Sequence, residues 1–139
     1  MSLRFESGRL WAARIAVMLV LIANLTAAVP YVLNPNRNAT AFELSGVAGA
    51  AMVRGIGILF LMWCVAYVPV IAHPDRHPAV FGVILVQQVI GLAGEAWIAA
   101  SLLPGHDVLS ATCLRFMVFD GVGLALLLLA LTLVRQRSK

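Results

Sequence analysis

Four long apolar runs, separated by short polar breaks, make up most of the 139-residue chain. The runs cover about residues 10–32, 46–72, 79–103 and 109–134. Each is longer than the roughly 20 residues that a helix needs to cross a hydrocarbon core about 30 Å thick. The pattern therefore predicts four membrane-spanning helices, which together form a single domain of residues 1–139.

The breaks between the runs have the composition of turns. Residues 34–38 follow the first run, residues 73–78 contain a proline near each end, and residues 104–107 follow the third run. Proline, asparagine and glycine end helices, and breaks this short return the chain in the opposite direction. We therefore expect an all-α integral membrane protein, an antiparallel four-helix transmembrane bundle.

Two features near the second run affect its expected structure. Residues 39–53 are apolar in part but are diluted by Glu43, Ser45 and two glycines. This segment fits either a helix on the membrane surface or the outer end of the second span. Pro69 lies close to the exit of the run, where the helix is expected to absorb it without a break in the middle.

Composition agrees with a membrane protein and excludes several other classes. Hydrophobic residues make up 62% of the chain and charged residues 12%, and the mean hydropathy is +0.96. These values lie outside the range of soluble domains. The net charge of +4 is carried mostly at the ends of the apolar runs, so it concerns orientation in the membrane. Since no stretch is polar enough to form a soluble basic face, we expect no nucleic-acid partner.

Lysine and arginine are unevenly distributed between the two sides of the predicted bundle. One side has Arg4, Arg9, Arg14, Arg76, Arg135, Arg137 and Lys139, and the other has Arg37, Arg54 and Arg115. Basic residues are retained on the cytoplasmic side of a membrane. The asymmetry predicts that both termini are cytoplasmic in a multi-pass protein of the cell membrane, namely the bacterial inner membrane.

A polar stripe inside the third span marks a candidate site in the outer half of the bundle. Gln88, Gly91 and Glu95 are spaced by three and four residues, and Gln87 adjoins them. Amides and carboxylates are tolerated in hydrocarbon only where they meet partners or water. The stripe therefore either lines a polar pocket between helices or forms a tight interface in which glycine allows close approach.

Four charged residues on three spans are expected at a similar depth: Arg54, Glu95, Arg115 and Asp120. An isolated charge near the bilayer centre costs about 2.5–3.5 kcal/mol on insertion scales, so pairing is favoured. We expect Glu95 to pair with Arg54 ahead of Arg115. An arginine at a helix end, such as Arg115, usually extends to the lipid head groups.

Two further residues complete the candidate ligand-binding set. Asn24 is the one strongly polar group in the middle of the first span, and Trp97 lies two residues from Glu95, where it is a candidate pocket wall. The complete set is Asn24, Arg54, Gln87, Gln88, Glu95, Trp97, Arg115 and Asp120.

We expect no catalytic set, metal or cofactor. His73 and His77 are four residues apart, but Pro74 between them disfavours the helix that would place both on one metal ion. No Ser-His-Asp set, glycine-rich phosphate loop or cysteine-pair motif occurs in the sequence.

The layout resembles the DoxX-like group of small four-helix membrane proteins. The resemblance covers roughly residues 14–134 and rests on Val53-Arg54-Gly55-Ile56-Gly57 at the second span, Gly91-Leu92 in the third and a Leu-rich last span. It implies a four-helix membrane fold in a functionally mixed group, some of whose members are associated with quinone-linked redox complexes. It implies no site residues, because Gln87-Gln88 and Gly94-Glu95 match no pattern of the group.

The sequence favours a non-enzymatic role. The chain is either a subunit of a larger membrane assembly or a binder of a lipid-like or quinone-like ligand whose polar head reaches Glu95, Gln88 and Arg54. The alternatives are a proton-coupled transporter that uses Glu95 as a relay and a membrane enzyme that acts on an apolar substrate. No second catalytic group is identifiable by spacing, which disfavours the enzyme. Expected partners are membrane lipids, another membrane protein or a second copy of the chain.

Overall fold

A computed structural model describes the backbone of residues 2–136 and the side chains of residues 8–136, and within this part the chain is helical without strands. Its elements are α1 (Ser2–Leu33), α2 (Pro35–Ala39), the 3-10 helix η1 (Thr40–Phe42), α3 (Gly46–Cys64), α4 (Tyr67–Ala72), α5 (Pro78–Ser101) and α6 (Asp107–Arg135). Four stretches are long and apolar enough to cross a membrane: Gly8–Leu33, Gly46–Ala72, Pro78–Ser101 and Asp107–Arg135. The expectation of an all-helical protein with four candidate membrane spans is confirmed.

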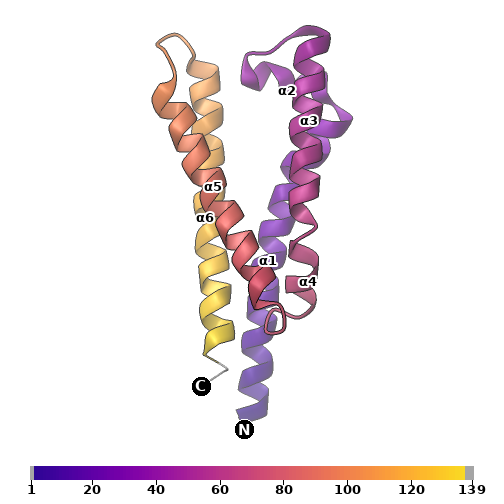
Figure 1. The fold of residues 1–139 in the computed structure, drawn as a ribbon, viewed down its shortest axis with the longest axis vertical. Helices are drawn as coiled ribbons and strands as arrows, with labels where there is room; N and C mark the ends of the chain where they lie inside the picture. The colour runs from indigo at the N-terminus through magenta and orange to yellow at the C-terminus, as the bar shows by residue number, and fades with distance from the viewer. Residues whose placement is uncertain (1, 137–139) are drawn as a thin grey trace.

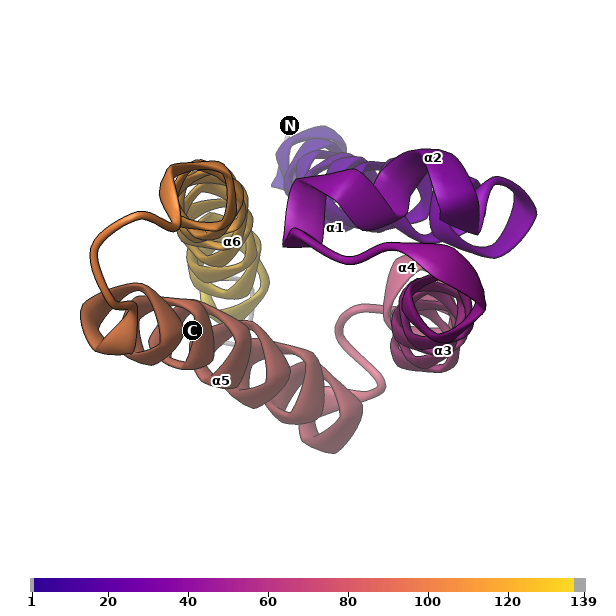
Figure 2. The same cartoon turned by 90° about the horizontal axis from the view of Figure 1, so that it is seen from above.

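The long helices form two pairs that meet at one end of the molecule. Figure 1 shows the start of α1, the end of α6 and α4 at this end, which we call the terminal end. Helix α2 and the turn between α5 and α6 lie at the opposite end, the loop end. Helix α1 packs on α3 and α5 packs on α6, while α1 and α6 join the two pairs. The pairs diverge toward the loop end, and the view along the bundle shows α5 tilted across it (Figure 2).

Apolar side chains fill the space between the pairs near the terminal end. Tyr67, Phe81, Ile84 and Leu127 are almost fully buried there. Small residues on α1 and α6 lie in the same cluster: Ala13, Ala16 and Ala130. Small side chains let membrane helices approach closely, so this end of the molecule is solidly packed.

Helix α3 and helix α4 form one candidate span with an interruption at residues 65–66. The span is continuous from Gly46 to Cys64, so its middle is unbroken as expected. The helix is nevertheless interrupted near its exit, just before Pro69. Proline has no N–H, and its ring clashes with the carbonyl group four residues earlier, which here belongs to Val65. That carbonyl instead accepts a tight-turn hydrogen bond from the N–H of Val68 at 3.3 Å.

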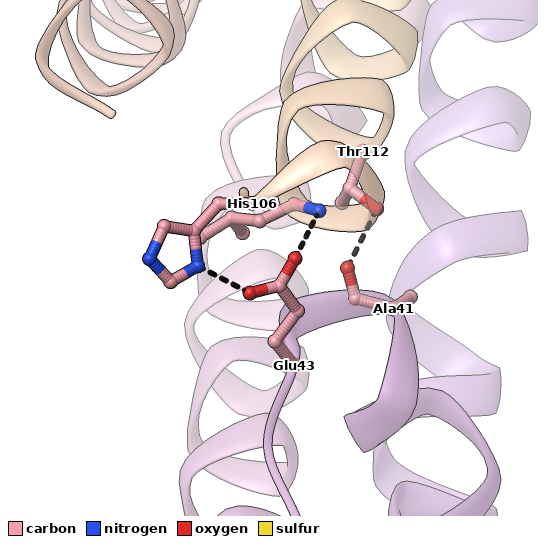
Figure 3. Close-up of polar contacts among 5 residues, drawn as sticks. Ala41, Glu43, His106 and Thr112 are labelled. Atoms are coloured by element: carbon pink, nitrogen blue, oxygen red, sulfur yellow. Dashed lines mark hydrogen bonds and ion pairs between the residues drawn. The ribbon is translucent and has the colours of Figure 1, made fainter. Parts of the chain in front are cut away.

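For residues 39–53 the sequence allowed two structures, and the segment in fact changes structure at Gly46. Residues 46–53 belong to α3, whereas residues 39–45 fold over its start through η1 and a turn. Glu43 ends η1 in the left-handed conformation with φ of 55°. This turn directs the Glu43 side chain toward the start of α6 (Figure 3).

Candidate functional site

A cavity of about 210 Å³ lies between the two helix pairs on the loop side of the apolar core. All four candidate spans contribute side chains to it. The polar ones are the amide of Asn24 on α1 and the carboxylates of Glu95 on α5 and Asp120 on α6. Aromatic rings form much of the remaining wall: Phe60 and Trp63 on α3, and Phe116 and Phe119 on α6.

The cavity is open on one side because α3 and α5 make hardly any contact with each other in the described part of the chain. Ile90 and Ile98 line the cavity from α5, yet 62% and 45% of their surfaces are exposed. Gly94, between them, is exposed as well. The opening therefore faces the side of the bundle, where a spanning helix would meet lipid.

A buried amide network closes the cavity on the side of the apolar core. Gln88 is 1% exposed, and its Oε1 accepts a hydrogen bond from the Tyr67 hydroxyl at 3.1 Å. Its Nε2 donates to Asp120 Oδ1 at 2.8 Å and to the Asp120 backbone oxygen at 3.3 Å. The network links α4, α5 and α6, and it satisfies both ends of the amide, as a buried amide requires.

Gly91 is placed where no other residue fits without a shift of its neighbours. A β-carbon at this position would lie 2.5 Å from Asp120 Oδ2 and 3.6 Å from the Trp63 ring. The stripe of Gln88, Gly91 and Glu95 thus combines the two arrangements that its sequence left open. Gln88 is part of a packed interface, and Gly91 and Glu95 border the cavity.

Glu95 lies where this cavity meets a second one of about 270 Å³. The two share Phe60, Glu95, Ile98 and Phe116, and the second extends toward the loop end beneath Phe42. Helix α6 lines the second cavity with a cysteine, and the Cys113 thiol faces the Glu95 carboxyl group. Glu95 therefore borders both cavities in the loop half of the molecule.

The expected pair of Arg54 and Glu95 is not present in the structure. The Arg54 Nε donates to the Val32 backbone oxygen at 3.3 Å, so the guanidinium group is held within the first helix pair. Glu95 belongs to the second pair, and the divergence of α3 from α5 separates the two residues. An ion pair does form at the loop end, where Glu43 meets His106.

Three other residues of the sequence-based set lie outside this cavity. The Arg115 guanidinium carbon is 5.4 Å from the Phe116 ring centroid, and the residue lines neighbouring hollows. Trp97 is 79% exposed and is not among the cavity residues, so it does not form the wall that we expected. Gln87 does not line the cavity either, and its Oε1 is buried without a hydrogen-bond partner among the described residues.

Several cavity residues escaped the sequence analysis. The sequence analysis assigned no role in the site to Phe60, Trp63, Phe116 or Phe119. Their spacing carries a weak signal, because residues three or four apart share one helix face. Phe60 and Trp63 are three apart, and Phe116 and Phe119 precede Asp120 on the same face of α6.

A polar clasp at the loop end was also unforeseen (Figure 3). The Glu43 Oε2 lies 2.5 Å from His106 Nδ1, and its Oε1 accepts a hydrogen bond from the N–H of Leu109 at 3.1 Å. The Thr112 hydroxyl donates to the Ala41 backbone oxygen at 2.6 Å. Hydrogen bonds from His106 and then from Leu109 lower the pKa of Glu43, because they stabilise the carboxylate. The clasp thus ties the η1 segment to the start of α6.

Comparisons of the chain with models of protein families, with curated proteins and with solved structures give no match. The resemblance to the DoxX-like group therefore stays an expectation from the sequence. What the chain does is argued below from the cavity and its surroundings.

Proposed function

We propose that the chain is a binding protein for a lipid-like amphiphile in a cell membrane. The polar head of the ligand occupies the cavity beside Glu95 and Asp120, and its apolar chain passes between α3 and α5 into the bilayer. In this proposal the four spans are antiparallel and both termini are cytoplasmic, in the bacterial inner membrane. The cavity then lies in the outer half of the bundle.

The lateral opening is the observation that carries the proposal. A soluble ligand enters a membrane protein from an aqueous end, whereas an amphiphile approaches from the lipid with its chain still in hydrocarbon. The cavity has polar groups inside and exposed isoleucines at its mouth, Ile90 and Ile98. This polarity matches a molecule with one polar end and one apolar end.

The proposal replaces part of the ligand-binding set expected from the sequence. Arg54 and Arg115 are engaged outside the cavity, so Asn24, Glu95 and Asp120 are the polar contacts that remain. Gln88 acts indirectly, because its amide is fully occupied in holding Asp120.

Protection of a cysteine at the mouth of the cavity tests this function. The Gly94→Cys variant, in a background with Cys64→Ala and Cys113→Ala, presents a thiol where an added β-carbon meets open space. We expect a membrane-soluble maleimide to label it, and octadecyl alcohol to slow the labelling. Val83→Cys is the matched control, since Val83 is 49% exposed on the same helix and outside the cavity.

Equal effects of the alcohol at both positions would contradict an amphiphile site. Protection by a co-purified membrane protein, with no effect of the alcohol, would favour the alternative in which the chain is a subunit of an assembly. That partner would fill the opening between α3 and α5 with its own helix.

Reporter fusions test the proposed orientation separately. The seven-to-three excess of basic residues predicts that a reporter active only in the cytoplasm works at both termini. Activity of a periplasmic reporter at either terminus would reverse the assignment of the outer half.

A further inference from the structure

We infer that the head group bound in this cavity is an organic cation of the quaternary ammonium type, held by Glu95 and Asp120 and surrounded by aromatic rings. The inference rests on the proposed function, because it specifies the polar end of the amphiphile. It also narrows the ligand class, since the sequence alone left lipid-like and quinone-like molecules open.

The charge of the cavity is the first argument. Glu95 and Asp120 both line it, and none of its lining residues in the described chain is Lys, Arg or His. Arg54 is bound to the Val32 backbone, and Arg115 lies beside the Phe116 ring without lining the cavity itself. Two carboxyl groups close together at membrane depth are costly to ionise unless they meet a positive group, and a cationic ligand would supply that group.

The direction of the free polar atoms is the second argument. Asp120 Oδ1 is occupied by the Gln88 amide, whereas Oδ2 lies against Gly91 at the cavity wall and accepts no hydrogen bond within the described chain. The Asn24 amide nitrogen donates to the Val20 backbone oxygen at 3.1 Å. The indole nitrogen of Trp63 is buried away from the open space. The cavity therefore presents more acceptors than donors, since two carboxyl groups face it and one N–H of Asn24 is already used by the backbone. Such a lining suits a cation better than the carbonyl oxygens of a quinone.

The aromatic walls are the third argument. The rings of Phe60 and Trp63 are 6.4 Å apart at 82°, and those of Phe60 and Phe116 are 6.1 Å apart at 76°. Phe119 adds a ring 6.5 Å from Phe116 at 78°. These rings pack edge to face on one another and line the cavity from α3 and α6. Aromatic faces attract cations, and sites lined by several rings bind quaternary ammonium groups.

The size of the cavity fits such a head group. About 210 Å³ holds several water-sized groups, which is comparable to a trimethylammonium head. The attached alkyl chain needs no room inside, because the opening beside Ile90 and Ile98 leads toward lipid.

Quenching of one tryptophan by labelled amphiphiles tests the inference. The variant with Trp11→Phe and Trp97→Phe retains Trp63, which lines the cavity. It is titrated in dodecyl maltoside micelles with three C18 chains that carry the same nitroxide and end in trimethylammonium, alcohol or carboxylate. We expect the ammonium compound to reach half-maximal quenching at a concentration about tenfold below that of the alcohol, and the carboxylate to be weakest.

Removal of the carboxylates identifies the source of the preference. Glu95→Gln leaves the Gln88 network intact and should remove a large part of the preference for ammonium, while binding of the alcohol changes little. Glu95→Gln with Asp120→Asn should abolish the preference. Asp107→Asn removes the same charge from an exposed position outside the cavity and should leave the preference intact.

The outcomes separate the two proposals. Saturable quenching by ammonium and alcohol at equal concentrations would overturn the cation inference, while the amphiphile site would stand. Loss of the ammonium preference in Asp107→Asn as well would also overturn it, because surface charge would then explain the effect. If none of the three compounds gives saturable quenching, the amphiphile site itself is wrong.

Discussion

The four long helices run through both halves of this bundle, but the half toward the terminal end is packed and the half toward the loop end contains an open cavity. Toward the terminal end, Ile84 and Leu127 are fully buried in an apolar cluster. Toward the loop end, Ile90 on the same helix as Ile84 is 62% exposed beside a cavity that contains two carboxyl groups. Ile84 faces the packed core, and Ile90, on another face of the same helix, lies at the mouth of the cavity.

Side-chain size explains much of the difference. Alanines such as Ala13, Ala16 and Ala130 let the helix pairs approach at the terminal end. At the loop end the space between the pairs contains the large rings of Phe60 and Phe116, which hold the helices apart. The packed half fixes the geometry, and the open half keeps room for a ligand.

The largest expected effect is on the network at the boundary between the halves. Gln88→Leu removes hydrogen bonds to Tyr67 and to the Asp120 carboxyl group, and we expect a loss of about 3 kcal/mol in unfolding free energy. Gln87→Leu is the matched control, because the Gln87 Oε1 is buried without a partner in the described chain and its removal should be neutral or stabilising. Unfolding in mixed detergent micelles measures both. Equal losses would mean that the network does not hold the halves together.

Two isoleucines on α5 compare a position in the packed core with one at the mouth of the cavity. Ile84→Ala opens a hole in the packed half and should cost about 2 kcal/mol. This is the low end for such substitutions, since the unfolded helix keeps the side chain in lipid or detergent rather than in water. Ile90→Ala should have little effect on the same unfolding measurement because the side chain is mostly exposed. A similar cost at both positions would remove the distinction between packed and open halves.

A smaller effect tests how tightly α1 packs on α3 in the open half. A β-carbon at Gly57 would lie 2.8 Å from the Tyr31 β-carbon and 3.0 Å from the Ala28 backbone oxygen. Gly57→Ala should therefore force α1 and α3 apart and lose about 1 kcal/mol. Gly55→Ala meets open space and should be tolerated in the same melting assay. Tolerance of both substitutions would show that α1 and α3 are loosely packed as well.

The smallest effect concerns the clasp and depends on pH. The pKa of Glu43 is lowered from its ordinary value of 4.5, so its stabilising contribution is present above that pH and is lost as the pH falls through the lowered pKa. The melting temperature of the wild type should therefore fall more steeply than that of Glu43→Gln in the acid range below about pH 4.5. At neutral pH the variant should melt slightly lower. Parallel curves across this range would show that the clasp does not contribute to stability.

The sequence predicted the four spans well because hydrophobic length is a local property. The candidate spans begin and end at the polar breaks, and the turn at residues 73–78 lies where its prolines indicate. The first break was wrongly expected to be a turn alone, because Pro35 starts a short helix there, α2 (Pro35–Ala39). The interruption at residues 65–66 was underestimated, because the clash that Pro69 makes falls four residues before the proline itself.

The candidate site was predicted less well because it depends on the angles between helices. Counting residues from each turn gave Arg54 and Glu95 a similar depth, yet their helices diverge and the two do not meet. Asn24, Glu95 and Asp120 do line one cavity, as their polarity in apolar runs suggested. The aromatic walls were missed because a phenylalanine in a membrane span looks the same in sequence whether it faces lipid or a cavity.

The pairing of the helices has a consequence for how the chain is made. Helix α1 finds its main early partner, α3, in the next long segment to leave the ribosome, and α5 likewise finds α6. Each pair can thus pack as soon as its second member enters the bilayer, with no wait for distant parts of the chain. Because α6 is the last helix to be made, we expect the face of α1 that it covers to stay open until then, and docking of the two pairs to come last.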